Sequence, residues 1–110
     1  MTLNALAARA HDTAKRKGWY DQTRTIPELL MLVVSELSEA LEEARKPDAR
    51  WGEVYYGDND KPEGLPIELA DAIVRIVDMA AHLGIDLDEA VRLKMAYNER
   101  REVRHGGKRF

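Results

Sequence analysis

The chain has 110 residues and a net charge of −3, with 45% hydrophobic and 34% charged residues. This size and balance predict a single folded domain, residues 1–110, and exclude a disordered chain. The absence of cysteine excludes disulfides, thiolate metal sites and cysteine nucleophiles. No apolar run approaches the roughly 18 residues of a membrane helix, and the weak negative charge gives no general attraction to nucleic acid. We therefore expect a cytoplasmic protein with neither membrane nor nucleic-acid partners.

An amphipathic helix is predicted over residues 2–17, because leucine and alanine recur there at helical spacing, and Gly18 ends it. The loop that follows carries Trp19 and Tyr20. Two interpretations stay open for these aromatic side chains. Either they cover the core at the end of the helix, or they form a stacking surface for a base, with Lys15 nearby to hold phosphate.

The sequence Thr25-Ile26-Pro27-Glu28 is a capping box, and it predicts a helix that runs to about Lys46, before Pro47. Glu36 and Glu39 lie three residues apart in this apolar segment, so they share a face of the helix. Glu36 falls at the border of the apolar stripe, whereas Glu39 lies further out. A carboxylate at the border of a core needs a partner, and a bound ligand or a nearby basic side chain both meet that need.

Residues 47–64 form a polar connection that is too long to be idle in a compact domain. Its segments Val54-Tyr55-Tyr56 and Gly57-Asp58-Asn59-Asp60 predict a small hairpin or an aromatic lid, to which Trp51 adds a third aromatic ring. A functional lid and a plain dimer contact both stay open for this connection.

The next helix is predicted over residues 66–83, and Glu68 and Asp71 repeat on it the pair of carboxylates three residues apart. With Arg75 and Asp78 they lie opposite an apolar stripe. That stripe comprises Leu69, Ala70, Ile73, Ile76, Val77 and Ala80. The acidic side is either a solvated face with ion pairs within the helix or a face turned toward a partner helix.

The sequence Asp86-Leu87-Asp88-Glu89 resembles a second capping box, in which Asp86 is the N-cap and Glu89 follows three residues later. It predicts a last helix from Leu87 to about Arg101. Beyond this helix, residues 102–110 form a basic tail. The tail is either a solvated terminus or a flexible clamp for phosphates, since its two glycines let the backbone approach an anion.

The two carboxylate pairs on neighbouring helices predict one acidic cluster, made of Glu36, Glu39, Glu68 and Asp71. Two like charges ~4 Å apart repel by about 4 kcal/mol at an effective dielectric constant near 20. Such a cluster is therefore either spread out in solvent or held together by cations. Carboxylate oxygens are ligands that suit Mg²⁺, usually shared with substrate phosphates. The sequence thus predicts a magnesium site that handles a nucleotide.

The motifs Glu36-x-x-Glu39 and Glu68-x-x-Asp71 resemble those of the MazG-like branch of the all-α nucleoside triphosphate pyrophosphohydrolases. Further segments that look like parts of this family are Lys61-Pro62-Glu63-Gly64, Lys94-Met95-Ala96-Tyr97-Asn98 and Arg104-His105-Gly106-Gly107-Lys108. The likeness covers residues 15–109. Ser35 departs from the pattern, because the wider superfamily often has a glutamate at that place.

The resemblance implies an all-α fold, a four-helix-type bundle completed by oligomerisation into a homodimer or homotetramer. It also implies hydrolysis of a nucleoside triphosphate to a monophosphate and pyrophosphate, in nucleotide-pool housekeeping, with Mg²⁺ or Mn²⁺ as its substitute. Glu36 and Glu39 are then the catalytic residues, Glu39 by acting on the attacking water. Together with Lys15, the substrate-binding residues expected on this basis are Trp19, Lys94, Tyr97, Asn98, Arg101 and Lys108. The alternative is a non-catalytic helical module that binds nucleotides or a protein partner.

Overall fold

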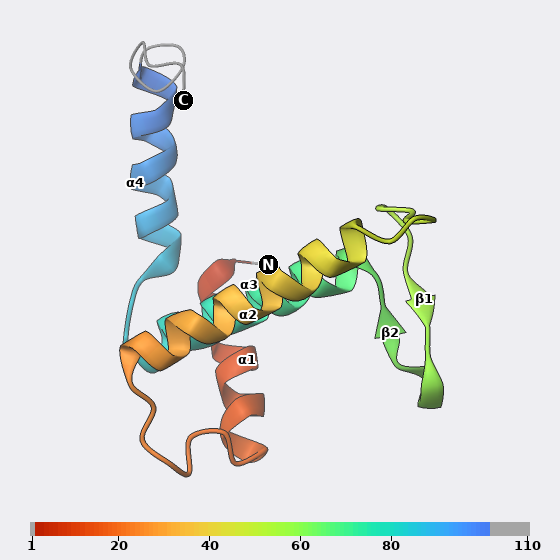
Figure 1. Cartoon of the computed structure of the whole chain (residues 1–110). Helices are drawn as coiled ribbons and strands as arrows, with labels where there is room; N and C mark the ends of the chain where they lie inside the picture. The colour runs from red at the N-terminus through yellow and green to blue at the C-terminus, as the bar shows by residue number, and fades with distance from the viewer. Residues whose placement is uncertain (1, 102–110) are drawn as a thin grey trace.

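The computed structural model describes residues 2–101, which form four helices and a small hairpin (Figure 1). The elements in chain order are α1 (Leu3–Arg16), α2 (Ile26–Ala44), β1 (Tyr55–Tyr56), the short 3-10 helix η1 (Asp58–Asp60), β2 (Pro62–Glu63), α3 (Leu65–His82) and α4 (Leu87–Arg100). The structure is thus mostly helical, in agreement with the predicted all-α class. None of these helices combines the length and hydropathy needed to cross a bilayer.

The helices begin where side chains supply the missing hydrogen bonds of the first turn. Thr2 accepts from the Ala5 amide, and Thr25 and Glu28 form the complete capping box that the sequence predicts. Asp86 accepts from the Glu89 amide, whereas the Glu89 side chain bonds to an arginine of its own helix and leaves the second half of that box unmade.

Helix α2 leads toward the hairpin and α3 returns from it alongside, so the two run antiparallel (Figure 1). Helix α1 packs on α3 as well. The buried apolar residues that join these three helices are Ala7, Leu29, Val33, Ala40, Ala72, Val77 and Ala80. Because four of these residues are alanines, the helix backbones approach closely over a small core.

Polar residues of the connection after α2 fold back as the predicted hairpin. Strands β1 and β2 pair antiparallel, with Tyr55 opposite Glu63 and Tyr56 opposite Pro62. Gly64 follows with a φ of 115°, a conformation that favours glycine, and a Cβ there would meet the Glu53 carbonyl oxygen at 2.7 Å. This turn sets the direction in which α3 begins.

Helix α4 projects away from the other three helices (Figure 1). Its first turn is fixed to the start of α1, because Asp88 accepts from the Leu3 amide at 2.8 Å and Asn4 accepts from the Leu87 amide at 3.0 Å. No residue of α4 is buried. Within the described part of the chain three helices therefore pack together, and the four-helix bundle stays a prediction that needs a second copy.

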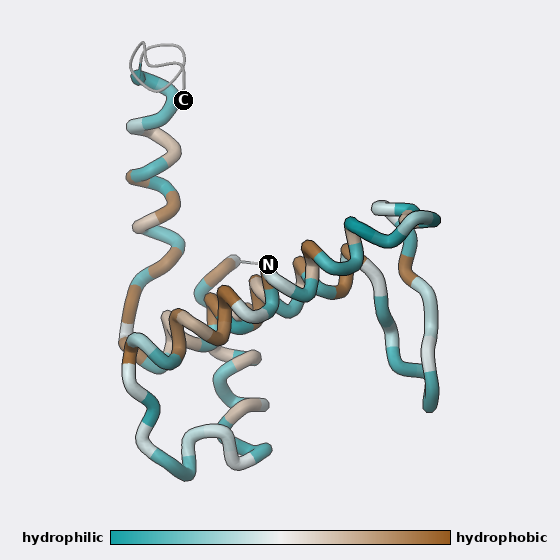
Figure 2. Tube along the Cα trace, in the orientation of Figure 1, coloured by the Kyte–Doolittle hydropathy of each residue, from teal (hydrophilic) through white to brown (hydrophobic). Residues whose placement is uncertain are grey.

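Apolar residues that stay exposed recur at helical spacing on α2 and α3, and brown segments run along both helices in Figure 2; we call these residues the open apolar face. The exposed members are Ile26, Leu30, Met31, Val34, Leu37 and Leu41 on α2, and Leu69, Ile73, Val74 and Ile76 on α3. The apolar stripe predicted for α3 is not buried along its whole width. Val77 is 1% exposed while Ile73 is exposed, and Asp78, expected on the polar side, is 8% exposed. The reason is that α1 and α2 pack on the side of α3 that carries its buried residues, Ala72, Val77, Asp78 and Ala80.

Candidate metal centre

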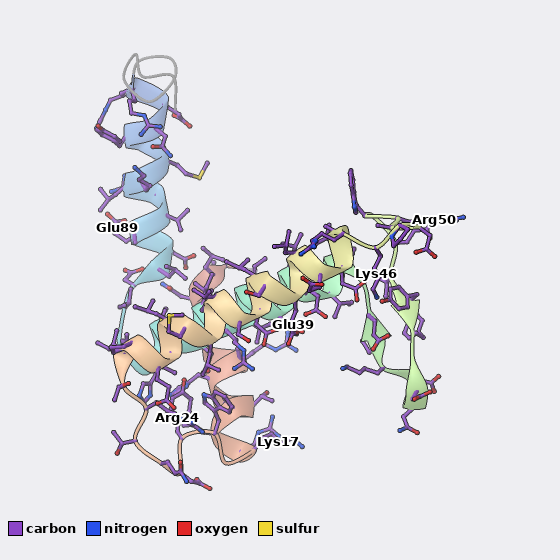
Figure 3. The ribbon with its side chains drawn as sticks, viewed as in Figure 1. Lys17, Arg24, Glu39, Lys46, Arg50 and Glu89 are labelled. Atoms are coloured by element: carbon purple, nitrogen blue, oxygen red, sulfur yellow. The ribbon has the colours of Figure 1, made fainter. Side chains whose placement is uncertain are left out.

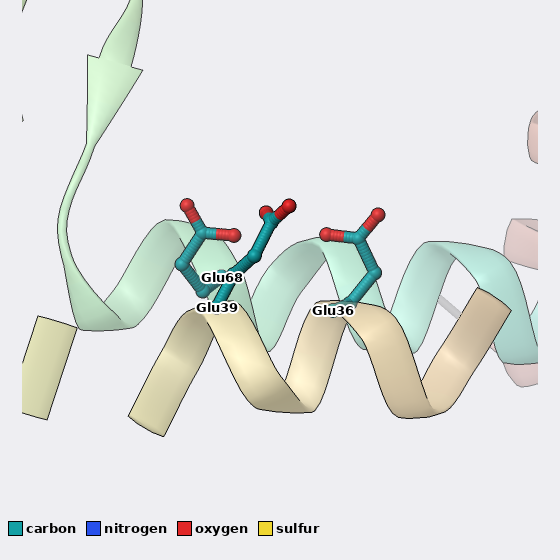
Figure 4. Close-up of side chains that lie close together, drawn as sticks. All are labelled: Glu36, Glu39 and Glu68. Atoms are coloured by element: carbon teal, nitrogen blue, oxygen red, sulfur yellow. The ribbon is translucent and has the colours of Figure 1, made fainter. Parts of the chain in front are cut away.

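Glu36 and Glu39 of α2 and Glu68 of α3 point to the same side of the helix pair (Figure 4). Each offers a carboxylate oxygen within 4.8 Å of the other two. They meet because Glu36 and Glu39 share a face of α2 and because α3 runs back beside α2 with Glu68 in its first turn. The structure therefore brings together three of the four predicted ligands.

The three carboxylates differ in burial. Glu39 is exposed, Glu68 is half-buried and Glu36 is 9% exposed. This order agrees with the sequence, which puts Glu36 at the core border and Glu39 further out. The Oε2 atom of Glu68 is buried and has no hydrogen-bond partner among residues 2–101. A buried carboxylate oxygen without a partner is unfavourable, so this atom is suited to a cation.

The cluster shifts the pKa of Glu68 from its ordinary value of 4.5 to about 7. Burial is the largest cause, followed by the hydrogen bond to the Glu39 side chain and by the charges of Glu39, Asp71 and Glu36. Burial and the surrounding negative charge thus favour the protonated form of the Glu68 carboxyl. A divalent ion removes the need for that proton, because it offsets the negative charge of the same oxygens.

Asp71 stands outside the group that converges within 4.8 Å. Its carboxyl is nevertheless close, since burial first and then the charge of Glu36 raise its pKa, while Arg75 lowers it. Its role as the fourth ligand stays a prediction.

Arg75 is the basic residue that the sequence did not connect with this site. Its Nε donates to Glu36 Oε1 at 2.7 Å, across from α3 to α2. Two alternatives stood open for this side of α3, ion pairs within the helix or a face turned toward a partner helix. Arg75 follows the second, because its side chain reaches Glu36 of α2. Only the packing of the two helices brings Arg75 to Glu36.

Trp19 lies at the same end of the cluster as Glu36. The guanidinium carbon of Arg24 is 4.2 Å from the centroid of its indole ring, and that of Arg75 is 5.0 Å away. Two cations therefore already cover part of the ring, and stacking on a base stays a prediction for Trp19.

Tyr20 follows the other interpretation, since it is half-buried and held against α1 and α3. Its hydroxyl donates to Asp78 Oδ2 at 2.8 Å, and its ring stacks on His82 with centroids 4.2 Å apart. His11 Nδ1 lies 2.9 Å from Asp78 Oδ1. This network fastens the loop after α1, α1 itself and α3 to one another.

A surface cavity of about 460 Å³ lies one helical turn beyond the cluster, toward the hairpin. Its walls are formed by the end of α2, the connection to β1 and the start of α3, and include Glu43, Lys46, Trp51, Tyr55 and Leu65. Apart from the aromatic residues of the connection, no sequence feature predicts this cavity.

Among the described residues, the others predicted to contact the substrate do not lie beside the acidic cluster of their own chain. Lys94, Tyr97, Asn98 and Arg101 lie on α4 or at its end, where the ammonium of Lys94 is 5.0 Å from the ring centroid of Tyr97. Figure 3 shows this helix, marked by Glu89, on a separate arm from Glu39. Lys15 is exposed in the last turn of α1. Lys108 and the basic tail 102–110 lie outside the described residues.

The donor set fits magnesium. It consists of carboxylate oxygens, and one of these oxygens is buried without a partner. Burial, together with the negative charge of the set, raises the pKa of Glu68. No nitrogen or sulfur ligand belongs to the group of three, which disfavours zinc.

Comparison with known proteins gives a short match. A stretch of 36 residues is 44% identical to the dATP/dGTP diphosphohydrolase of Cyanophage S-2L. It covers 33% of this chain and 34% of that relative, so the chain matches about a third of the relative's length. No family model and no solved structure matches the chain.

Proposed function

We propose that this chain is a magnesium-dependent nucleoside triphosphate pyrophosphohydrolase of the MazG-like kind, with Mn²⁺ as a substitute metal, acting in the cytoplasm on the nucleotide pool. The observation that carries the proposal is the convergence of Glu36, Glu39 and Glu68 within 4.8 Å. The partial likeness to the diphosphohydrolase of Cyanophage S-2L supports hydrolysis of a nucleotide over binding alone.

Bound magnesium would offset the charge of the phosphates and orient them for in-line attack. Glu36, Glu39 and Glu68 would hold the ion through carboxylate oxygens, and Asp71 would complete the set. Glu39 is the exposed member of the three, so we assign it to accept the proton of the attacking water. The water oxygen bonds to the α-phosphorus while the bond to the bridging oxygen breaks, and the products are a nucleoside monophosphate and pyrophosphate.

The proposal includes a homodimer or homotetramer. The open apolar face of α2 and α3 supports it, because exposed apolar residues that cluster in this way are typical of association surfaces. Helix α4 carries Lys94, Asn98 and Arg101 away from the cluster of its own chain. In an assembly these side chains can serve the cluster of a neighbouring copy, where we assign them to the outer phosphates and the sugar. Light scattering on the purified chain tests this part, and a monomer at micromolar concentration contradicts it.

The activity is tested with a panel of canonical and damaged nucleoside triphosphates, each incubated with Mg²⁺, with Mn²⁺ and with EDTA. The panel includes dATP and dGTP because the relative's name contains them. We expect release of pyrophosphate, and not of orthophosphate, and only in the incubations that contain Mg²⁺ or Mn²⁺. Orthophosphate as the product contradicts the proposed reaction. A nucleotide that raises the melting temperature without any turnover indicates the binding module instead.

A further inference from the structure

The Glu36 end of the acidic cluster carries its own positive charge. Arg75 donates from Nε to Glu36 Oε1 at 2.7 Å, and Glu36 and Arg75 have side chains 11% and 32% exposed. Charge-assisted hydrogen bonds of this length between partly buried groups are among the stronger ones in proteins. Arg75 therefore neutralises one of the carboxylates that the proposed metal centre uses.

The same guanidinium also contacts an aromatic ring. Arg75 lies 5.0 Å from the centroid of Trp19, where Arg24 is the second cation at 4.2 Å. Arg24 has local partners, since its Nε donates to the Trp19 carbonyl oxygen at 2.8 Å and its Nη1 lies 3.3 Å from Glu28. Arg24 is thus fixed within its own loop and helix, while the position of Arg75 depends on Glu36.

We infer that Arg75 is a built-in counter-cation of the acidic cluster, which holds Glu36 in the metal-free protein and leaves it when a divalent ion binds. The inference rests on the proposed metal centre and adds a residue that regulates its occupancy. Because Arg75 lies over Trp19, its departure changes the surroundings of the indole. Trp19 then reports whether the cluster holds metal.

The physical reason is competition for one carboxylate. Magnesium and the guanidinium both seek the oxygens of Glu36, and a divalent ion repels a neighbouring cation twice as strongly as a monovalent ion at the same distance. Without Arg75 the cluster also keeps its full negative charge. Both effects act in the same direction, so removing Arg75 strengthens metal binding. A residue that merely supported the fold would weaken binding when removed.

The experiment uses the full chain with Trp51→Phe, which leaves Trp19 as the single tryptophan of the two in the sequence. Mg²⁺ is titrated into nucleotide-free protein at constant ionic strength, with binding measured by calorimetry and the surroundings of Trp19 by its fluorescence. We expect the emission of Trp19 to change with the same midpoint as the heat of binding. In Arg75→Gln we expect magnesium to bind about tenfold tighter, with most of the fluorescence response lost.

Arg24→Gln is the matched control, because it removes the other guanidinium over Trp19 without touching the cluster. It should leave the magnesium affinity within about twofold and keep a fluorescence response to metal. Arg75→Lys keeps the positive charge but lacks the planar guanidinium. It replaces Arg75→Gln in the experiment if the circular dichroism spectrum of Arg75→Gln is not that of a folded protein. We expect its magnesium affinity to lie above that of the parent protein.

Glu39→Gln separates this inference from the proposed function. If the parent protein binds magnesium and Glu39→Gln does not, the metal centre stands. Unchanged or weaker binding in a folded Arg75 variant then overturns the role of Arg75 alone. If the parent protein binds no magnesium at all, the proposed metal centre fails, and the inference fails with it.

Discussion

Glu39 and Glu43 lie one turn apart on α2, yet their surroundings are opposite. Glu43 accepts a hydrogen bond from the Tyr55 hydroxyl at 2.8 Å and another from Lys46 Nζ at 3.0 Å. These contacts, Tyr55 first, lower the pKa of Glu43. Beside Glu39, by contrast, Glu68 is surrounded by other carboxylates, and its pKa is raised to about 7.

The difference teaches that the sequence pattern of acidic residues does not define a metal site on its own. Glu43 continues the face of Glu36 and Glu39 by helical spacing, but the hairpin brings a tyrosine to it. The carboxylates of Glu39 and Glu68, by contrast, lie mainly beside each other. A carboxylate that is hydrogen-bonded within the protein stabilises the fold. Carboxylates that repel one another bind a cation more strongly, because the cation relieves their repulsion.

The largest expected effect is on catalysis, and it tests the difference between Glu39 and Glu43 directly. We expect Glu39→Gln to lower the rate of pyrophosphate release by at least about 100-fold, since even indirect partners of metal ligands are worth about 10–100-fold. Glu43→Gln is the matched control on the same helix, and it should retain the activity of the parent within about threefold. Equal losses in both variants would show that the cluster has no special role.

A second variant extends the comparison to a buried carboxylate with partners. Asp78→Ala leaves the Tyr20 hydroxyl and His11 without their acceptor, so we expect the free energy of unfolding to fall by about 3 kcal/mol. Urea denaturation measures it. Asp12→Ala removes an exposed carboxylate that pairs with Arg16 on the surface of α1, and it should change stability by no more than about 0.5 kcal/mol. An equally small loss for Asp78→Ala contradicts the structural role of the network.

The pH dependence of stability gives the next effect, and its sign follows from the raised pKa of Glu68. The folded protein keeps the proton of Glu68 up to about pH 7, whereas the unfolded chain releases it near 4.5. Raising the pH through this window therefore lowers stability. In EDTA, we expect Glu68→Gln to melt at a higher temperature than the parent at pH 8, with the two melting temperatures converging toward pH 4. A constant difference between the two melting temperatures from pH 4 to pH 8 would rule out a raised pKa of Glu68.

The smallest effect concerns Glu43 itself. Tyr55→Phe removes the hydroxyl that is the largest cause of the lowered pKa, so the pKa of Glu43 should rise toward its ordinary value. Carboxyl ¹³C chemical shifts followed over a pH titration measure it. Tyr56→Phe, at the next position of the same strand, should leave the titration of Glu43 unchanged.

Much of the local structure follows from residues close in sequence. Thr25 with Glu28 predicts the start of α2, and Asp86 predicts the start of α4, because capping depends on side chains within one turn. The carboxylate pair Glu36 and Glu39 is predictable for the same reason, since helical spacing alone puts both residues on one face. The end of α2 at Ala44 comes earlier than the predicted Lys46, as helix ends fray and depend weakly on sequence.

The contacts between helices follow from no such local rule. Arg75 pairs with Glu36, and Ile73 stays exposed, because the crossing of α1, α2 and α3 is set by which small residues allow close approach. The outward direction of α4 depends on hydrogen bonds between Asn4, Asp88 and neighbouring amides, which join residues from opposite ends of the chain. None of these pairings leaves a periodic signal in the sequence.

The sequence by itself determined that this protein is helical, where its helices begin, and that two of them carry paired carboxylates. These properties depend on neighbours within one or two turns, where backbone geometry is fixed. Only the tertiary structure decided that Glu36, Glu39 and Glu68 converge while Glu43 is satisfied elsewhere, and that Arg75 opposes the charge of Glu36. Those outcomes depend on how antiparallel helices align and where a hairpin folds back, which is governed by packing between residues far apart in the chain.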